Sequence, residues 1–264
     1  MPTLYVVVPY FNEPRTLAAC IDRLQAAPLS AGWSRHVVLV DDASAPAGRS
    51  AADAVAARAE GQTGRVDPIN RADGHHDDPH RLQALTLLRH ARNAGKGAAL
   101  MTGFDWILAR ARDEDAALVH DADLEYDPAD HAVLVAALTN DPLVAVFGDR
   151  WHGAAIRPGL VAWLHRTGNR TLTALSNAVS GLRVHDMECC SKLLRMPLLR
   201  AIRPGLSEPR FGIEPQLTAA IARAGGSIRE VPVRYDARGF SDGKKIGARD
   251  GLRALWVIVR ERLR

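Results

Sequence analysis

The sequence predicts an α/β fold in which helices cover a mostly parallel sheet. Over the first 150 residues, short apolar runs rich in β-branched residues alternate with segments of helical spacing, an order that is typical of such folds. The runs are almost continuously apolar, as expected for parallel strands that are buried on both faces. The chain has 264 residues, 47% of them apolar, which is enough for a sizeable core in a single domain.

The first strand is expected over residues 4–8, an apolar run that a proline ends. The first helix is expected over residues 14–24, because Leu17, Ile21 and Leu24 recur at helical spacing. The same reasoning predicts the other elements of this half: strands over 36–40, 85–88, 116–119 and 143–147, helices over 48–60 and 128–138, and a helix that follows residues 93–97 and ends near 112.

Residues 61–84 interrupt the alternation with a segment rich in Gly, Asp, His and Pro, which predicts an exposed loop. Beyond Gly148 the alternation is less regular. No repeat or linker divides the chain, so we expect one domain over residues 1–264. Its second half is predicted to contain helices over 160–179 and 213–223, a strand over 228–233 and an amphipathic segment over 251–264.

Composition excludes some classes of protein. The formal net charge of +4 is mild and spread along the chain, so it does not indicate a nucleic-acid partner, although it suits anionic substrates or an anionic membrane surface. The cysteines are Cys20, Cys189 and Cys190, an odd and sparse set that favours reduced thiols and a cytoplasmic setting. The N-terminus enters a strand at once, so no signal peptide is expected. No apolar run reaches the roughly 18–20 residues that a membrane span needs.

Polar residues follow four of the predicted strands or the turns after them. Parallel sheets bind ligands beyond the carboxyl ends of their strands. We therefore expect these segments to converge on one ligand site at that edge of the sheet. The segments are residues 9–13, Asp41 with Asp42, residues 93–96, and Asp121 with Asp123.

Asp121 and Asp123 lie two residues apart directly after a buried strand, with Glu125 in reach if the chain stays extended. Ligands that are all oxygens suit Mg²⁺ or Mn²⁺, and Mg²⁺ commonly combines one or two carboxylates with phosphate oxygens of a substrate. The alternative is that these are ordinary loop acids. Asp127 is sufficiently explained as a helix cap before Pro128.

Three further features suggest anion or nucleotide binding, each with a plainer alternative. Lys96 stands between glycines at a helix start, a setting that favours anion binding. The alternative is that this segment is a simple strand-to-helix turn. Asp41 and Asp42 are placed to accept hydrogen bonds from a ribose or base, or they serve turn chemistry. The basic run that contains Arg238 and Lys244 could close over a diphosphate, or it is a solvated loop.

The motifs also occur in a familiar order: VPYFNE at 8–13, VDDAS at 40–44, NAGKG at 93–97, DAD at 121–123, GDR at 148–150, GNR at 168–170, DMECCSK at 186–192, FGIE at 211–214, EVPV at 230–233 and GKKI at 243–246. This set resembles the family 2 glycosyltransferases of the GT-A fold, which is Rossmann-like. It is most similar to the branch of dolichyl- or polyprenyl-phosphate mannose synthases. The likeness covers nearly the whole chain except residues 61–84.

The resemblance implies a role for each half of the domain. Residues 1–150 would bind a nucleotide-sugar, and residues 151–264 would face the acceptor. Pro9, Tyr10 and Glu13 would line the nucleoside pocket with Asp41 or Asp42, and Lys96 would belong to the same donor site. The other implied site residues are Asp121, Ala122 and Asp123 against the metal and diphosphate, Glu125 as a third ligand, Arg150, Arg238 and Lys244 toward phosphates, and Asp186 and Glu214 near the acceptor.

The expected activity is an inverting, metal-dependent transfer of mannose or glucose from GDP or UDP to a polyprenyl or dolichyl phosphate. Such a phosphate is already a nucleophile at neutral pH, whereas a hydroxyl acceptor would need a base. Asp186 and Glu188 are the candidates for that base. The alternatives are a soluble hydroxyl acceptor with the same donor, or a non-catalytic nucleotide-sugar-binding subunit.

Two features leave the acceptor open. Many lipid-linked relatives carry transmembrane helices after the catalytic domain, which this chain lacks, and residues 61–84 are longer than usual. The segment over 251–264 has apolar residues between arginines. It would either rest on an anionic bilayer or pack on the core with an arginine-rich outer face. The expected location is therefore cytoplasmic, with peripheral contact at the inner face of the membrane as the variant.

Overall fold

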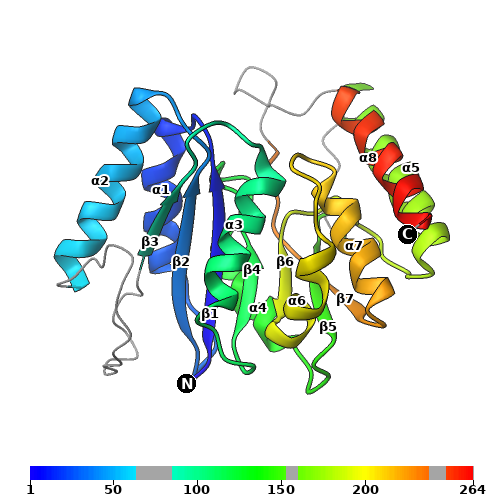
Figure 1. Cartoon of the computed structure of the whole chain (residues 1–264), viewed down its shortest axis with the longest axis horizontal. Helices are drawn as coiled ribbons and strands as arrows, with labels where there is room; N and C mark the ends of the chain where they lie inside the picture. Colours follow the sequence, from blue (N-terminus) through cyan, green and yellow to red (C-terminus); the bar gives the residue numbers. More distant parts are fainter. Residues whose placement is uncertain (64–84, 153–159, 238–247, 264) are drawn as a thin grey trace.

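The computed structural model describes residues 1–63, 85–152, 160–237 and 248–263 (Figure 1). Within these residues the chain forms one seven-stranded sheet in the order β3-β2-β1-β4-β6-β5-β7. The neighbours of β6 run antiparallel to it, and the other pairs are parallel. The strands are β1 (Thr3–Tyr10), β2 (Ser34–Asp41), β3 (Leu85–Arg89), β4 (Ala116–Val119), β5 (Val144–Asp149), β6 (Lys192–Arg195) and β7 (Ser227–Pro232).

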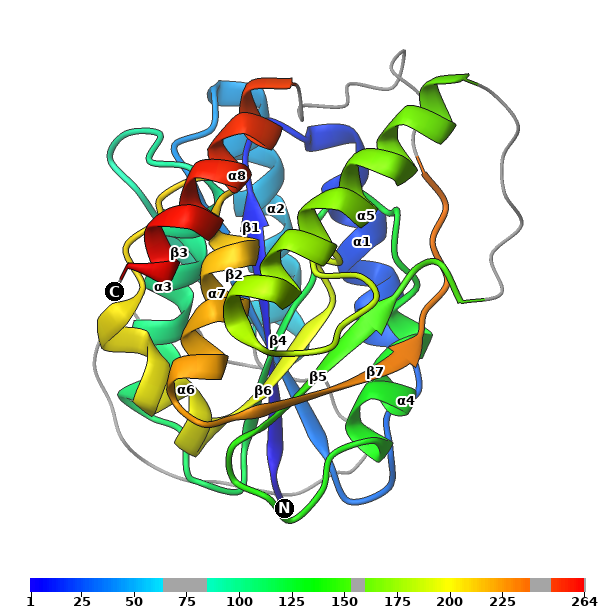
Figure 2. The ribbon, with the colours of Figure 1, turned by 90° about the vertical axis from the view of Figure 1, so that its right-hand side faces the viewer.

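Helices cover both faces of the sheet (Figures 1 and 2). One apolar cluster joins the sheet to α1, α2 and α4, and a second joins its other face to α3, α6 and α7. Outside α7, α5 and α8 form a further layer. The helices are α1 (Pro14–Ala26), α2 (Pro46–Thr63), α3 (Lys96–Leu108), α4 (His131–Ala136), α5 (Leu160–Ser180), α6 (Met196–Ile202), α7 (Ile213–Arg223) and α8 (Ala248–Arg262), with short 3₁₀ turns η1 (Pro128–Asp130) and η2 (Arg203–Gly205).

Alternation of side chains along the strands explains why the sheet has two cores. Val6 and Val8 of β1 point to the cluster of α1 and α2, whereas Val7 between them points to the cluster of α3. Successive residues of a strand face opposite sides of the sheet, so an unbroken apolar run is needed where both sides are covered. The continuous apolar runs of the sequence therefore mark the centre of the sheet.

The predicted mostly parallel α/β fold is confirmed, and each strand expected from the sequence is present. Two elements were not predicted, the antiparallel strand β6 and the helix α6 that follows it. Helix α2 extends to Thr63, so the first three residues of the expected loop over 61–84 are helical. The remainder of that loop lies outside the described residues. In the parts of the chain that are described, no helix combines the length and apolar character needed to cross a bilayer.

Candidate functional site

The carboxyl ends of β1, β2 and β4 lie side by side, as the predicted site requires. Tyr10 of β1 pairs in register with Asp41 of β2, and the N–H of His120, just after β4, donates to the carbonyl oxygen of Val7. Because the strands are parallel, the segments that follow them leave the sheet at one edge. The acids after β2 and β4 are therefore brought together by topology.

The backbone is strained where these three strands end. Among the described residues, Asn12, Ala43 and Leu124 are the ones other than glycine with positive φ, at 51°, 60° and 66°. Each stands in the turn that follows β1, β2 or β4. Such conformations cost free energy and gather at functional sites, where neighbouring contacts hold them in place. Their position independently marks this edge of the sheet.

Asp42 fixes the turn that precedes α3. Its carboxylate accepts hydrogen bonds from the backbone N–H groups of Ala94 and Gly95 at 2.8 and 2.7 Å. It also accepts from Asn93 Nδ2 at 2.8 Å and lies 2.7 Å from His90 Nδ1. Both carboxylate oxygens are hydrogen-bonded and the side chain is buried. The first role of Asp42 is therefore to order the turn that precedes α3, not to contact a ligand.

Asp41 is buried beside the predicted nucleoside pocket. Its Oδ1 accepts from the N–H of Ser44 at 2.9 Å, and its Oδ2 lies 3.5 Å from Arg89 Nε. The hydroxyl of Tyr10 donates to the carbonyl oxygen of Gly48 at 3.0 Å. Pro9 is the last but one residue of β1. Glu13 precedes α1, and its carbonyl oxygen accepts hydrogen bonds from the first turn of that helix. The predicted nucleoside residues thus lie on adjacent turns, and their contacts with a nucleotide stay a prediction.

Lys96 is the centre of a buried charge network. Its ammonium lies 3.0 and 3.1 Å from the two carboxylate oxygens of Asp121 and 3.1 Å from Glu214 Oε1. Cys190 Sγ is 3.0 Å away. Glu214 is also 2.6 Å from Lys192 Nζ. The glycine-flanked lysine therefore meets protein carboxylates directly.

These contacts decide the protonation of the pair. Burial alone would lower the pKa of Lys96, but Asp121 and Glu214 raise it well above the ordinary value. Burial would likewise raise the pKa of Asp121, but the Lys96 ammonium outweighs it and the pKa of Asp121 is lowered. Both groups are therefore charged at neutral pH. A ligand would therefore meet Asp121 as a carboxylate whose negative charge is partly balanced by Lys96.

The three acids proposed as metal ligands point to different partners. Asp121 pairs with Lys96, Asp123 Oδ1 accepts from the N–H of Glu125 at 3.1 Å, and Glu125 Oε2 accepts from the Tyr235 hydroxyl at 2.9 Å. Within the described residues no three His, Cys, Asp or Glu side chains lie so that together they could hold a metal ion. A donor set made of carboxylate oxygens fits a hard divalent ion that takes its other ligands from a bound diphosphate. It does not form a complete protein cage.

Arg150 and Asp186 form a buried ion pair. Arg150 Nε and Nη2 donate to the two oxygens of Asp186, each at 2.7 Å, and the backbone N–H of Arg150 donates at 3.1 Å. Glu230 accepts from the N–H groups of His185 and Asp186. This bidentate geometry is among the strongest for a side-chain pair. It ties the end of β5 to the loop before β6, so that the ion pair orders the predicted acceptor half.

Glu188 differs from Asp186 in having an unused oxygen. Its Oε1 is buried and has no hydrogen-bond partner in the described part of the chain. Burial raises the pKa of Glu188 to about 7, and nearby Glu214 adds to the rise. A carboxyl group with such a pKa can accept or release a proton near neutral pH. Of the two predicted bases, Glu188 is therefore the one whose carboxylate has an oxygen available to take up a proton.

The structure thus brings most predicted residues to one edge, and some partners were not predicted. Cys190, Lys192 and Tyr235 were missed as members of the site, as was Tyr126, whose hydroxyl accepts from the N–H of Cys190 at 3.1 Å. Lys192 could have been noticed as a charged residue inside an apolar stretch, and the others carried no local signal. Ala122 is buried between the two acids. Arg238 and Lys244 lie outside the described residues.

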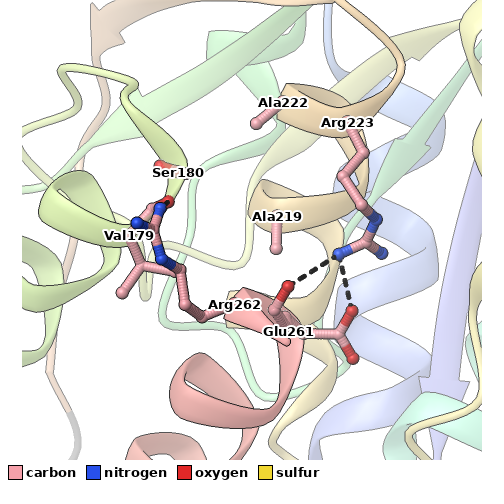
Figure 3. A pocket seen from close by; sticks show the side chains of 7 residues that line it. All are labelled: Val179, Ser180, Ala219, Ala222, Arg223, Glu261 and Arg262. Carbon is pink, nitrogen blue, oxygen red and sulfur yellow. Dashed lines mark hydrogen bonds and ion pairs between the residues drawn. The ribbon is translucent and has the colours of Figure 1, made fainter. Parts of the chain in front are cut away.

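A hollow of about 330 Å³ is found elsewhere, between the C-terminal parts of α5, α7 and α8 (Figure 3). Arg223 Nη1 lies 2.8 Å from Glu261 Oε2 at its side. None of the residues that line it belongs to the predicted site, so we assign it no part in binding the donor. The lining residues are Val179, Ser180, Ala219, Ala222, Arg223, Glu261 and Arg262.

Comparison with known proteins gives relatives of one kind. Residues 5–203 match the family model described as glycosyl transferase family 2. The chain is 28% identical over 200 residues to the dodecaprenyl-phosphate galacturonate synthase of Rhizobium johnstonii, which covers 76% of this chain and 50% of that protein. It is 26% identical over 273 residues to the undecaprenyl-phosphate mannosyltransferase of Micrococcus luteus, with 97% of each covered.

A solved structure confirms the fold. Glucosyl-3-phosphoglycerate synthase from Mycobacterium tuberculosis, in complex with Mn²⁺, UDP-glucose and phosphoglyceric acid, superposes with a TM-score of 0.62. The sequence identity is 18%, and the match covers 99% of this chain and 80% of that one. At this identity the likeness supports the GT-A fold and says nothing of the substrates of the present chain.

Proposed function

The chain belongs to glycosyl transferase family 2, and from this premise we propose that it transfers a hexose, mannose or glucose, from a GDP- or UDP-sugar to a polyprenyl phosphate. The transfer inverts the anomeric carbon. The names of two relatives, a dodecaprenyl-phosphate galacturonate synthase and an undecaprenyl-phosphate mannosyltransferase, support the acceptor class. The second of these relatives is covered over nearly its full length.

One observation carries the proposal for the donor: Lys96 holds Asp121 ionised at the carboxyl end of β4, beside the turn that Asp42 orders. A diphosphate placed there would lie beside Asp121 and Asp123, whose carboxylates can share a divalent ion with its phosphate oxygens. Tyr10, Glu13 and Asp41 stand on the neighbouring turns, where a nucleoside would lie. The geometry supports a donor site shared by these strands.

Asp123, with Asp121 beside it, would hold Mg²⁺ or Mn²⁺ in this site, and Glu125 remains a candidate third ligand. When bound, such an ion neutralises charge that develops on the departing diphosphate. Asp123 Oδ1 also accepts from the N–H of Glu125, which fixes the orientation of its carboxylate. The turn after β4 thus orients the carboxylate of Asp123 before the donor binds.

A phosphate acceptor needs little help from the protein to become a nucleophile. Its second pKa is about 6, so that most of it is a dianion at neutral pH. The remaining task is to position it and to screen its charge. Arg150 faces Asp186, so we assign the pair to ordering the acceptor loop. Arg238 and Lys244 remain the proposed phosphate contacts.

A second candidate keeps the donor and uses a soluble hydroxyl acceptor. The observation in its favour is Glu188, whose buried Oε1 lacks a hydrogen-bond partner among the described residues and whose pKa of about 7 suits a general base. The proton of the acceptor hydroxyl would move to Glu188 as the bond to the sugar forms. This candidate predicts transfer to a water-soluble product.

The two candidates are separated by following a radiolabelled sugar. The protein is incubated with labelled GDP-mannose or UDP-glucose, Mn²⁺ and undecaprenyl phosphate, and the label is extracted into organic solvent. We expect label in the organic phase with one of the donors and loss of the signal on chelation. Asp123→Asn should lower the rate by about a hundredfold or more, because stabilisation of the leaving group is lost.

Asp113→Asn is the matched control, since Asp113 is a surface acid with 77% of its side chain exposed and lies outside the site. It should leave the rate unchanged. Organic-phase label that is equal in Asp123→Asn and the parent would contradict the proposed role of Asp123. Label that passes from the donor into a new water-soluble product, separated from the donor by chromatography, would favour the hydroxyl acceptor. A donor that stays unconsumed in every mixture would contradict both candidates.

A further inference from the structure

Helix α8 presents an unusual number of exposed apolar side chains. Of the seven large hydrophobic residues that are exposed in the described part of the chain, five lie on α8 or directly after it. Leu252, Trp256 and Leu263 are exposed to 67%, 49% and 84%. The set recurs every three or four positions, which places it along one face of the helix. It consists of Leu252, Leu255, Trp256, Val259 and Leu263, and we call it the outer stripe.

The opposite face of α8 is packed against the protein. Ala254, Val257 and Ile258 are buried toward α7 and α5. Arg253 donates from Nε and Nη2 to buried Glu208, each at 3.0 Å. The helix therefore satisfies its structural role with one face, and the ion pair fixes its rotation about its axis. The outer stripe is held outward.

The surroundings of the outer stripe are positive. On α5 and α8 the described side chains include five arginines and two acids, and with buried Glu208, which pairs with Arg253 and Arg260, the arginines still outnumber the acids by five to three. The guanidinium groups of Arg253 and Arg260 lie 4.6 and 4.7 Å from the ring of Trp256. The arginines are Arg166, Arg170, Arg253, Arg260 and Arg262.

The two helices run next to each other on one side of the molecule (Figure 2). The first turn of α8 lies toward the edge of the sheet at which β1, β2 and β4 end (Figures 1 and 2). A surface that received the outer stripe would therefore reach the level of the sheet edge that carries the candidate site.

We propose that the outer stripe of α8 docks on the surface of an anionic phospholipid bilayer. Leu, Trp and Val side chains on one face would enter the boundary between head groups and acyl chains, and the flanking arginines would meet lipid phosphates. The positive charge selects a lipid surface over a second copy of this chain, whose equivalent face would carry the same charge. The binding requires no donor or acceptor, so it does not depend on the proposed function.

The test compares two exposed valines. Val259 lies in the outer stripe and is 50% exposed, and Val133 on α4 is 47% exposed but lies elsewhere. The parent, Val259→Ser and Val133→Ser are sedimented with vesicles of phosphatidylcholine, with or without phosphatidylglycerol. The parent should bind the phosphatidylglycerol vesicles, and added salt should weaken this binding because it screens the arginines.

We expect Val259→Ser to bind about threefold more weakly and Leu252→Ser combined with Val259→Ser about tenfold or more, since each loses apolar area that enters the bilayer. Val133→Ser should match the parent. Circular dichroism verifies that the variants keep the fold, which surface positions allow. The proposal would be overturned if the double variant and the parent bound the vesicles equally well. It would also be overturned if the parent bound vesicles with and without phosphatidylglycerol equally well.

A second outcome would also overturn it. If the parent is a dimer in sedimentation velocity and the double variant is a monomer, the outer stripe is an interface between copies of this chain. Failure of the transfer assay together with vesicle binding would refute the proposed function alone. Transfer without vesicle binding would refute only the docking of α8.

Discussion

At the scale of single residues, the acids at the strand ends act first on the protein itself. Asp42 holds the turn before α3 through two backbone N–H groups and Asn93, and Asp121 is paired with Lys96. A buried carboxylate is costly unless it is paired or hydrogen-bonded. These contacts remove that cost and leave the carboxylates oriented. The site is thus ordered in advance of its ligands, which reduces the entropy that binding has to overcome.

Glu188 gives a prediction about pH and stability. Its pKa is raised to about 7 by burial, with Glu214 adding to the rise, whereas an unfolded chain would show about 4.3. Between these values the folded protein holds a proton that the unfolded chain has lost, so the stability falls as pH rises from about 4.3 to about 7. The other charged groups that act on Glu188 are Lys192, Arg150 and Asp186.

Glu188→Gln mimics the protonated form and should abolish this fall. The free energy of unfolding of the variant relative to the parent should therefore grow by on the order of 2 kcal/mol between about pH 5 and about pH 8. Urea unfolding at several pH values measures it. Glu114→Gln is the control, because Glu114 is a surface residue with 53% of its side chain exposed. A difference from the parent that is the same at every pH would contradict the assignment.

The sequence predicted the acids of the site better than their partners. Asp121 and Asp123 were recognisable because they follow a buried strand at a spacing of two. The contacts of Lys96 with Cys190 and Glu214 were not, because these two residues come from segments far along the chain that only the fold brings together. Lys96 was singled out as an anion contact, and the structure adds that it meets carboxylates first. Local patterns identify which residues are unusual, and contacts between distant segments decide what they touch.

At the scale of elements, the missed strand β6 has an identifiable reason. It has four residues and begins with a buried lysine, Lys192, whose ammonium is bound by Glu214. A short run led by a charged residue gives no strand signal. It enters the centre of the sheet antiparallel, between β4 and β5, which the alternation of strands and helices does not predict. The long apolar strands and the periodic helices were predicted because burial alone dictates their pattern.

The start of α3 supplies a prediction at this scale. A Cβ atom at Gly97 would lie against the backbone carbonyl oxygen of Glu208, well inside contact distance. Ala98 N–H donates to the carbonyl oxygen of Pro209 at 3.0 Å, so this approach of α3 to the 208–210 segment is tight. Gly97→Ala should lower the free energy of unfolding by about 1–3 kcal/mol, since the backbone has to move.

Gly168→Ala is the matched control for this glycine. Gly168 is also helical, in α5, but a Cβ atom there would meet nothing within 4 Å. That substitution should stabilise the protein by about 0.5–1 kcal/mol, the difference in helix propensity between the two residues. Thermal or urea unfolding measures both. A loss of stability in Gly168→Ala that equals the loss in Gly97→Ala would show that close packing is not the cause.

At the scale of the whole molecule, the candidate site and α8 are joined by a short series of contacts. Asp121 pairs with Lys96 at the start of α3, and the same first turn of α3 packs on residues 208–210. Glu208 of that segment is fully buried and accepts both hydrogen bonds of Arg253 on α8. The second half of the chain thus connects the acids of the first half to the helix that carries the outer stripe.

This connection predicts that Glu208→Gln loosens α8. The substitution keeps the shape of the side chain but removes the charge that faces Arg253, with Arg260 Nη1 at 3.6 Å. Because both arginines can partly reach water, with 46% and 21% of their side chains exposed, we expect a loss of about 1–3 kcal/mol and no unfolding. Hydrogen exchange should quicken in α8 more than in α1. Asp22→Asn is the control, since its exposed pair with Arg58 also joins two helices but contributes less than about 1 kcal/mol. Unchanged exchange in α8 would show that apolar packing alone holds this helix.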